Sequence, residues 1–467
     1  MTTDRKVIGL AVAGAVGGFL FGFDSSVING ALDAIKSDFG LDAGLQGFVV
    51  AIALLGCALG AFLAGRLADR FGRIPVMIVG ATLFVISAIG AGFAFTVPVL
   101  IAARVVGGIG IGIASVVAPT YIAEVSPAGS RGRLGSLQQL AITVGIFVAL
   151  LSDTVLAGLA GDESAVLWFG LPAWRWMFLV GVIPGLVYGL IATRLPESPR
   201  YLVLRGADAQ ATAVLERYWS GEDAGQAVRD IRDSISTESA TTDGATLRAP
   251  RTGLKPIVWI GIALSVFQQF VGINVIFYYS TELWAAVGFV QADALIISVV
   301  TGLLNIVVTL VAIALVDRIG RRPLLLTGSI LMAVSLAAMA LAFAQGPAGQ
   351  LEGAWGPVAL VAANLFVIGF GASWGPLVWV LLGEIFPNAI RAKALGLAAA
   401  AQWIANFAVT LTFPPLSAIS LPLTYGMYAA FAALSFFFVL KLVPETKGMA
   451  LEDADTLLQR PAATVVS

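Results

Sequence analysis

Long apolar stretches recur along the whole chain, and they limit its possible folds more than any other feature. About 20 apolar residues let a helix span the hydrocarbon core of a bilayer, and by that measure the sequence holds roughly twelve spans. Because backbone polar groups inside a bilayer must bond within the protein, such stretches form helices. We therefore predict an all-α polytopic membrane protein, with spans near 7–30, 45–65, 74–95, 97–121, 133–158, 173–194, 256–285, 293–316, 323–344, 356–382, 393–415 and 421–442.

The composition supports this class and excludes several functions. Hydrophobic residues make up 58% of the chain and charged residues 12%, whereas a soluble domain carries about 25% charged residues. The net charge of -1 argues against nucleic-acid binding, and the single cysteine, Cys57, provides no disulfide framework or thiolate cluster. The chain has no histidine, no phosphate-binding loop and no nucleophile constellation. We therefore expect neither an enzyme nor a cofactor or metal site.

Basic residues fall on alternate connections between the spans, and this pattern predicts the orientation of the chain. The connections after the second, fourth, eighth and tenth spans are basic, while the opposite side is mostly acidic. Since basic loops stay in the cytoplasm, we expect both termini and the polar segment between the sixth and seventh spans there. The basic residues are Arg66, Arg70, Arg73, Arg131, Arg133, Arg318, Arg321, Arg322, Arg391 and Lys393, and the acidic ones are Asp33, Asp38, Asp42, Asp162, Glu163, Asp293 and Glu352.

The two halves of the chain repeat three motifs in the same order. They are DRFGR at 69–73 and DRIGR at 317–321, PES at 196–198 and PET at 444–446, and E-x-x-P-x-x-x-R at 124–131 and 384–391. Duplicated bundles with a binding site at their interface are a transporter design. We expect bundles at 1–195 and 253–443, a cytoplasmic helical linker at 196–252 and a cytoplasmic tail at 444–467.

Two charged residues lie inside apolar stretches, Asp24 in the first and Arg104 in the fourth. A charge in the membrane costs roughly 2.5–3.5 kcal/mol, so such a residue usually has a partner and lines an ion or substrate path. At 1.5 Å per residue, Asp24 lies roughly 25 Å above the cytoplasmic start of its span and Arg104 roughly 10 Å below the outer face. These depths are compatible with a pair that binds a transported proton. The alternative is a static ion pair that only fixes packing.

Neutral amides recur in the spans together with aromatic residues. An amide both donates and accepts hydrogen bonds, which suits an uncharged polyhydroxyl ligand, and aromatic faces suit the C–H side of a sugar ring. The alternative is that these amides only hold helices together. The amides are Gln138, Gln139, Gln268, Gln269, Asn274, Asn305, Gln402 and Asn406, and the aromatics are Phe23, Tyr278, Tyr279, Trp379 and Trp403.

These residues resemble the sugar porter family of the major facilitator superfamily. The similarity runs from GFD at 22–24 to PETKG at 444–448, and it includes PESPR at 196–200, QQFVGIN at 268–274 and EIFP at 384–387. Within the family, the chain is most similar to bacterial proton-coupled xylose and glucose symporters. The resemblance implies the major facilitator fold, in which twelve transmembrane helices form two six-helix bundles joined by a cytoplasmic helical linker.

The resemblance also implies roles for single residues. In the similar xylose symporter, the aspartate matching Asp24 is the proton site and the arginine matching Arg104 tunes it, whereas facilitative glucose carriers typically have asparagine in place of the aspartate. Ile146 stands where the xylose symporter has glutamine and glucose carriers have isoleucine, which favours glucose. The implied sugar-binding residues are Gln139, Ile146, Gln268, Gln269, Asn274, Asn305, Trp379 and Gln402. The gate is expected at Phe23, Tyr278, Tyr279, Gly375 and Pro376, of which the last two are expected to unwind the tenth span.

Charged residues also gather at the cytoplasmic ends of the spans. They can be topology-setting charges with weak surface salt bridges. The resemblance instead implies a salt-bridge network between the bundles, closed when the carrier faces outward and broken when it faces inward. Its members are Asp69, Arg70, Arg73, Glu124, Arg131, Glu197, Arg200, Asp317, Arg321, Glu384, Arg391 and Glu445.

We therefore expect a proton-coupled monosaccharide importer that works by alternating access, with D-glucose as the leading substrate. The alternatives are a myo-inositol or pentose (xylose) symporter of the same family, a facilitative uniporter in which Asp24 is structural, and a sugar sensor. The expected partners are a sugar, a proton and the lipid bilayer. We expect the chain to function as a monomer in the inner (plasma) membrane.

Overall fold

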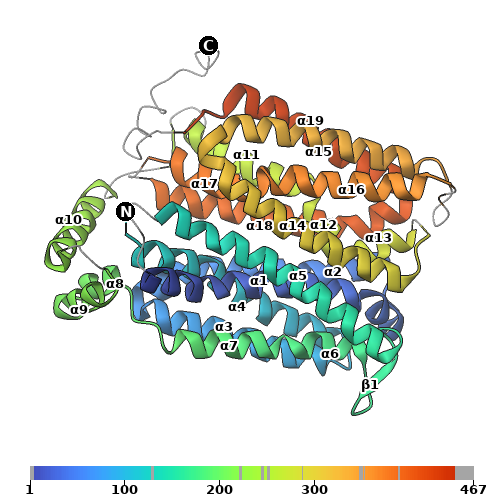
Figure 1. The fold of residues 1–467 in the computed structure, drawn as a ribbon, viewed down its shortest axis with the longest axis horizontal. Coiled ribbons are helices and arrows are strands. Elements are labelled where there is room, and N and C mark those ends of the chain that lie inside the picture. The colour runs from blue at the N-terminus through green and yellow to red at the C-terminus, as the bar shows by residue number, and fades with distance from the viewer. Residues whose placement is uncertain are drawn as a thin grey trace. The chain divides into compact units, whose positions relative to one another are not determined.

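A computed structural model of the protein describes residues 5–127, 131–219, 223–242, 247–249, 253–286, 288–346, 351, 353–387 and 390–447. Twelve helical segments within these residues are long and apolar enough to cross a membrane. The prediction of an all-α polytopic protein with twelve spans is therefore confirmed (Figure 1).

The first half of the chain supplies six spans, a short hairpin and three further short helices. Its elements are α1 (Arg5–Phe39), α2 (Ala43–Phe71), α3 (Arg73–Gly92), α4 (Val97–Val125), α5 (Arg131–Ala160), β1 (Val166–Trp168), β2 (Leu171–Pro172), α6 (Ala173–Val180), α7 (Val182–Ala192), α8 (Pro199–Leu204), α9 (Asp208–Tyr218) and α10 (Ala224–Thr242). The sixth span is divided between α6 and α7 at Gly181. The hairpin pairs Trp168 with Leu171 and was not predicted.

The second half supplies the other six spans, and two of them are interrupted. Its elements are α11 (Pro256–Phe270), α12 (Ile273–Tyr278), α13 (Ser280–Ala286), α14 (Gln291–Ile319), α15 (Arg321–Phe343), α16 (Trp355–Gly371), α17 (Trp374–Ile385), α18 (Arg391–Ile419) and α19 (Leu421–Leu442). The seventh span breaks between α11 and α12, at Gly272 with φ +82°. The tenth span breaks between α16 and α17, at Ala372 and Ser373.

The break in the tenth span lies a few residues earlier than predicted. Gly375 and Pro376 are helical and belong to the first turn of α17, while Ser373 is the residue with non-helical backbone (φ −139°, ψ −87°). The physical reason is that proline is tolerated in a first turn, where its missing N–H has no helical acceptor to lose. Pro376 therefore follows the break instead of forming it.

The chain divides into two compact units that interleave along the sequence. Unit 1 comprises 1–24, 55–145 and 178–245, and unit 2 comprises 25–54, 146–177 and 246–467. The division passes through α1, α2, α5 and α6, so it differs from a division at the centre of the sequence. The boundaries at 195, 252 and 443 stay a prediction.

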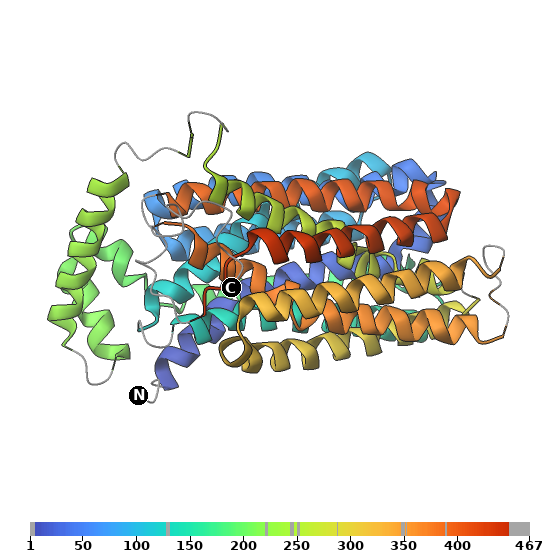
Figure 2. The ribbon, with the colours of Figure 1, turned by 90° about the horizontal axis from the view of Figure 1, so that it is seen from above.

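Small residues let the helices of unit 1 approach closely. A Cβ atom on Gly56 would lie 2.5 Å from the Val105 carbonyl oxygen, and one on Gly110 would lie 2.7 Å from that of Gly80. Glycine thus brings α4 against both α2 and α3, as is common between membrane helices. The short helices α8, α9 and α10, green in Figure 2, pack on their own apolar cluster, which includes Leu202 and Leu215.

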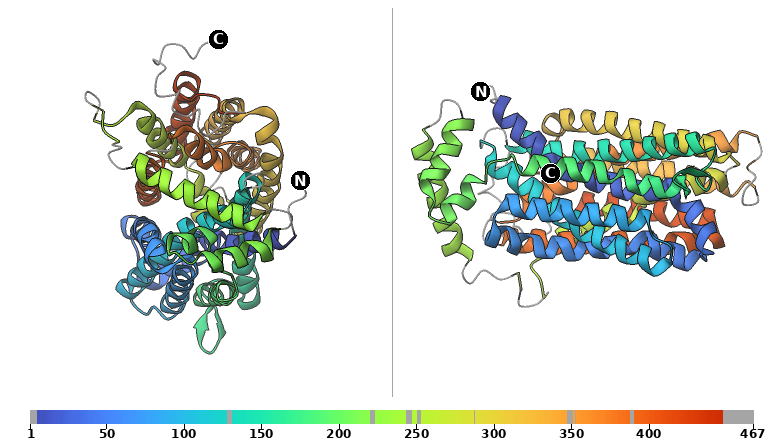
Figure 3. Two further views of the ribbon diagram at one scale, coloured as in Figure 1. Left: turned by 90° about the vertical axis from the view of Figure 1, so that its left-hand side faces the viewer. Right: turned by 90° about the horizontal axis from the view of Figure 1, so that it is seen from below.

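Unit 2 holds most of the second half of the chain. Helix α15 packs against α16 and α19 along much of its length. The hairpin β1–β2 follows α5 and projects beyond it, as the left view of Figure 3 shows. The described sugar-site candidates of the second half all lie in this unit, around the two broken spans.

Candidate functional site

Asp24 and Arg104 form a buried ion pair inside unit 1. Nη1 of Arg104 in α4 donates to Oδ2 of Asp24 in α1 at 2.9 Å. Asp24 is 8% exposed and Arg104 3% exposed. Gly107, one turn beyond Arg104, has no side chain, and a Cβ there would clash with the Ser87 hydroxyl and lie 3.8 Å from Asp24 Oδ1. The pairing expected from depth in the sequence is therefore present in the structure.

The expected role of this pair in proton binding stays a prediction. The guanidinium of Arg104 stabilises the charged form of the Asp24 carboxyl group, and removing one partner of such a buried pair leaves the other charge uncompensated. Within the described residues, Arg104 Nε has no hydrogen-bond partner. Protonation of Asp24 would therefore break the main contact that Arg104 makes, and would free the arginine to move.

An amide chain connects the two broken spans of unit 2. Nε2 of Gln268 donates to the carbonyl oxygens of Trp374 at 2.9 Å and Gly375 at 3.1 Å. Nε2 of Gln269 donates to Oε1 of Gln268 at 3.4 Å, and Nδ2 of Asn274 donates to Oε1 of Gln269 at 2.6 Å. The left-handed backbone at Gly272 turns the chain so that Asn274, in α12, reaches back to Gln269, in α11.

Asn305 approaches the same break from α14. Its side chain is 7% exposed, and its Oδ1 lies 3.2 Å from the position of a Cβ on Gly371, the last residue of α16. Gln268 and Asn305 thus both face the junction of α16 and α17, where an interrupted helix leaves backbone groups without helical partners. Polar groups at such a junction suit an uncharged, hydroxyl-rich ligand.

The other predicted sugar ligands are placed less closely together. Trp379 in α17 is 41% exposed, and Gln402 in α18 is half-buried, with an Oε1 that has no hydrogen-bond partner within the described residues. Gln139 and Ile146 are half-buried in α5, and they belong to different units. Within unit 2, no hydrogen bond among the described residues links Trp379 or Gln402 to the amide chain of Gln268, Gln269 and Asn274.

Four of the five predicted gate residues are buried, and the fifth, Pro376, is half-buried. Tyr278 ends α12 with 3% exposure. The hydroxyl of the fully buried Tyr279 donates to the Thr410 carbonyl at 2.9 Å, and its ring lies 5.0 Å from that of Phe413. In unit 1, Phe23 is 1% exposed and stacks on Phe19 at 6.2 Å. Tyr278 is the last residue of α12 and Tyr279 follows it, so both lie a few residues after the break in the seventh span at Gly272.

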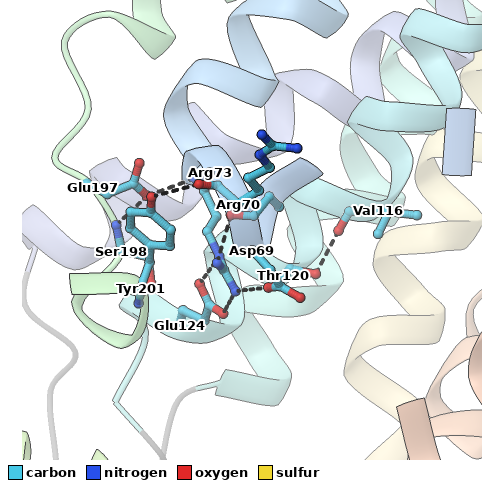
Figure 4. Close-up of polar contacts among 10 residues, drawn as sticks. Asp69, Arg70, Arg73, Val116, Thr120, Glu124, Glu197, Ser198 and Tyr201 are labelled. Carbon is cyan, nitrogen blue, oxygen red and sulfur yellow. Dashed lines mark hydrogen bonds and ion pairs between the residues drawn. The ribbon is translucent and has the colours of Figure 1, made fainter. Parts of the chain in front are cut away.

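At the predicted cytoplasmic end of unit 1, three residues form what we call the N-side cluster: Arg73, Glu124 and Glu197 (Figure 4). Arg73 makes two parallel bonds to Glu124, from Nε to Oε2 at 2.8 Å and from Nη2 to Oε1 at 2.7 Å. Glu197 accepts the backbone N–H groups of Arg73 and Ile74 at 3.0 and 3.2 Å. The carboxylate thus binds the N-terminus of α3, where the helix dipole favours negative charge.

The C-side cluster in unit 2, Arg321, Glu384 and Glu445, repeats this geometry. Nε and Nη2 of Arg321 donate to the two oxygens of Glu384 at 3.2 and 2.8 Å. Glu445 accepts the N–H groups of Arg321 and Arg322, each at 3.0 Å. The duplication predicted from the motifs is therefore visible as two equivalent clusters.

The remaining members of the predicted network are more peripheral. Asp69 lies 3.4 Å from Nη2 of Arg73 and is largely exposed. The carbonyl of Arg70 accepts from Tyr201 and Arg205, and Nε of Arg391 donates to the Phe386 carbonyl at 3.0 Å. Arg200 lies half-buried in α8, and the side chains of Arg131 and Asp317 are outside the described residues. The contacts of both clusters run within one half of the chain, so the network between bundles stays a prediction.

Sequence reasoning missed a group of contacts that we call the outer set: Asn29, Lys36, Gln46, Thr281 and Glu282, all in unit 2. Thr281 donates to Asn29 through its N–H at 3.1 Å and through its hydroxyl at 3.0 Å. Nε2 of Gln46 donates to Glu282 at 2.5 Å, and Lys36 lies 3.7 Å from the same carboxylate. Asn29 is a polar residue in the first apolar stretch, and this signal could have identified it.

Burial raises the pKa of Glu282 above its ordinary value of 4.5, and the nearby Asp33 raises this pKa further, against the opposing effect of the Gln46 hydrogen bond. Burial likewise raises the pKa of Glu163, which follows α5. In the outer set, Glu282 therefore loses its proton at a higher pH than an ordinary glutamate does.

Comparisons with known proteins agree with this architecture. The family model described as "Sugar (and other) transporter" matches residues 10–458. A "Glucose transport protein" of Synechocystis sp. is 54% identical over 454 residues, which cover 96% of this chain and 97% of the relative. The "D-xylose-proton symporter" of Escherichia coli (strain K12) is 38% identical over 485 residues, covering 97% and 95%.

Solved structures match as well. The xylose transporter XylE from E. coli, in a partially occluded inward open conformation, matches with a TM-score of 0.83 and 36% identity, over 96% of this chain and 100% of that chain. The proton:xylose symporter XylE bound to 6-bromo-6-deoxy-D-glucose matches with a TM-score of 0.81 and 37% identity, over 97% and 99%. The major facilitator fold expected from the sequence is therefore confirmed.

Proposed function

The chain belongs to the family of sugar transporters, and we propose that it imports a monosaccharide, D-glucose, together with a proton by alternating access. The observation that carries this proposal is the Asp24–Arg104 pair, an ion pair at 2.9 Å in the interior of a membrane protein. Buried charges of this kind are retained in membrane spans chiefly for function. A proton that neutralises Asp24 changes what Arg104 contacts, and so links proton binding to conformation.

One proton per sugar provides enough energy for concentrative uptake. Moving one charge through 100 mV supplies about 2.3 kcal/mol, which sustains roughly 45-fold accumulation of a neutral cargo at 1.4 kcal/mol per tenfold. A neutral sugar adds no charge of its own, and the amide chain of Gln268, Gln269 and Asn274 offers it donors and acceptors without charge.

Glucose is favoured over xylose by two observations. Ile146 places an apolar side chain in α5, two helical turns after Gln139, at the position where the resemblance associates isoleucine with glucose carriers. The relative from Synechocystis, 54% identical over nearly the full chain, is a glucose transport protein by name. Xylose remains the second candidate substrate, since the xylose symporter of E. coli is 38% identical, and myo-inositol the third.

The orientation, membrane and oligomeric state form part of the same proposal. Basic residues on alternate connections favour cytoplasmic termini and a cytoplasmic linker. In a bacterium this location means the inner membrane, and one chain already contains both halves of the duplicated architecture. We propose that the monomer is the working unit.

The test is transport in liposomes with the native protein and Asp24→Asn. We expect an inward proton gradient to drive accumulation of labelled glucose by the native protein, and the variant to equilibrate or exchange sugar without accumulating it. Asp42→Asn is the matched control, because Asp42 is exposed and caps α2 at 2.8 Å from Leu45 N, and asparagine caps equally well.

Three outcomes discriminate between the candidates. Native uptake that ignores the gradient, matched by Asp24→Asn, would identify a uniporter with a structural Asp24. If the gradient drives accumulation of xylose or myo-inositol but not of glucose, the proposal of proton coupling stands and the proposed substrate is wrong. Asp42→Asn losing accumulation alongside Asp24→Asn would show that the effect is not specific to the buried pair.

A further inference from the structure

A second carboxyl group, Asp153 of α5, is buried in the spans and has no role in the coupling proposed above. Its side chain has 0% exposure and lies in the span Leu134–Ala160. It packs on Gly30 of α1, where a Cβ atom would lie 2.5 Å from the Asp153 Cβ and 2.7 Å from its Oδ2. Only glycine at position 30 leaves room for this carboxyl group.

Asp153 differs from Asp24 because no cation among the described residues bonds to its carboxyl group. Within the described residues, neither carboxyl oxygen has a hydrogen-bond partner, and Gly30 of α1 lies directly against the carboxyl group. The charged groups of the segments around it that lie on the predicted outer side of Asp153 are Asp33 and Lys36 on α1, Asp162 and Glu163 after α5, Glu282 on α13 and Asp293 on α14. In the part of the chain that the structure describes, none of them forms a hydrogen bond with either Asp153 oxygen.

An ionised carboxylate in such a place is strongly disfavoured, because it has lost water and gained neither a cation nor donors. Asp153 therefore carries a proton in this conformation. An aspartate in contact with water at neutral pH is ionised. Whether Asp153 holds its proton thus depends on whether water reaches it.

The packing around Asp153 shows which movement would admit water. On α5, Leu150 lies one turn before Asp153, and α14 packs there through Gly302, where a Cβ would lie 3.2 Å from Leu150 Cδ1 and 3.3 Å from Phe147 Cα. Asp153 is near the end of α5 that leads to the acidic residues Asp162 and Glu163, which is the outer end in the proposed orientation. Separation of α14 from α5 would open this region to outer water.

We propose that Asp153 is a second proton-binding residue, which must take a proton from outer water before α14 can close against α5, and which returns that proton to the same side when they part. The O–H bond forms on closing and breaks on opening, so Asp153 carries no net proton across the membrane. External pH thereby sets the rate of outer closure, while the coupling ratio stays with Asp24. This proposal rests on the proposed alternating-access transport.

The first test is glucose exchange in liposomes at fixed internal pH and varied external pH. It is measured in the Asp24→Asn background, so that titration of Asp24 does not contribute. We expect exchange to slow several-fold as the external pH rises from neutral to alkaline, and Asp24→Asn/Asp153→Asn to lose that dependence. Asp24→Asn/Asp293→Asn, which alters an exposed carboxylate of α14, should keep it. An unchanged pH profile in the double variant with Asp153→Asn would overturn the proposal.

The second test does not depend on transport. Infrared spectra of the purified protein at neutral pH should contain the C=O stretch of a protonated carboxyl that shifts in D₂O and is absent from Asp153→Asn. Asp153→Ser serves as a second variant where the asparagine form does not fold. Identical native and variant spectra would overturn the proposal. If the infrared band is present but the native protein does not transport glucose, the proposed function is wrong. The protonation of Asp153 would still be established.

Discussion

Each arginine that begins a helix after a glycine turn is held by two glutamates from distant parts of the chain. Arg73 and Arg321 follow Gly72 and Gly320, whose φ angles of +96° and +107° favour glycine. A Cβ on Gly72 or Gly320 would clash with the glutamate that binds the next helix N-terminus, Glu197 or Glu445. In each half, the glycine therefore permits the turn and also leaves room for the glutamate that binds the N-terminus of the next helix.

Loss of Glu124 should destabilise the protein strongly. The Arg73 and Glu124 side chains are 5% and 9% exposed and 2.7 Å apart, and removing one partner of a buried pair costs about 3–5 kcal/mol. We expect Glu124→Gln to lower the Tm in detergent markedly. Glu216→Gln on α9, an exposed position, is the control and should change Tm little. Equal Tm values for the two variants would show that the N-side cluster is only a surface contact.

At the scale of elements, interrupted helices create the polar surfaces of unit 2. Gln268 of the seventh span donates to the carbonyls of Trp374 and Gly375, which lie in the first turn of α17, just after the break between α16 and α17. The break between α11 and α12 turns Asn274 back toward Gln269. The two breaks thus bring these side-chain amides and backbone carbonyls within hydrogen-bond distance of one another.

Gly272 should be irreplaceable at its break. Its φ of +82° costs an L-residue about 1–2 kcal/mol, and a Cβ there would lie 2.7 Å from the Tyr428 ring. We expect Gly272→Ala to lower both Tm and glucose affinity, since Asn274 would move from Gln269. Gly426→Ala is the matched control, because nothing lies within 4 Å of its Cβ position and alanine favours a helix by about 0.5–1 kcal/mol. A Gly272→Ala protein that is as stable as Gly426→Ala would contradict this account.

At the scale of the whole molecule, the chain is built by duplication, but its compact units do not follow the duplication. The N-side and C-side clusters are equivalent, one in each half. The outer set, by contrast, joins Asn29 and Gln46 of the first half to Thr281 and Glu282 of the second within unit 2. These hydrogen bonds between the two halves join α1 and α2 to α13 within unit 2.

The outer set should make stability depend on pH through Glu282. The folded pKa of Glu282 is raised above the ordinary 4.5, so the folded protein binds the proton more tightly than the unfolded chain does. The resulting stabilisation is fully present below pH 4.5 and is lost as the pH rises through the folded pKa. We expect the native Tm to fall over that window and Glu282→Gln, which stays neutral, to fall less.

The control for this experiment is Asp293→Asn, an exposed carboxylate on α14. It should retain the native dependence of Tm on pH. A Glu282→Gln protein with the native pH profile would show that Glu282 does not titrate in this window, and would assign the dependence to other groups.

The sequence by itself determined the twelve spans, the duplication and the identity of the buried charges. Spans are local, because each must satisfy its own backbone in a bilayer, and a charge such as Asp24 is conspicuous in an apolar stretch. Only the tertiary structure decided where the helices break, that Glu197 and Glu445 bind helix N-termini, and that Asp153 packs on Gly30. These features depend on which distant segments pack against one another. The apolar pattern predicts how deep a residue lies in the membrane, but it does not predict which helix lies beside it.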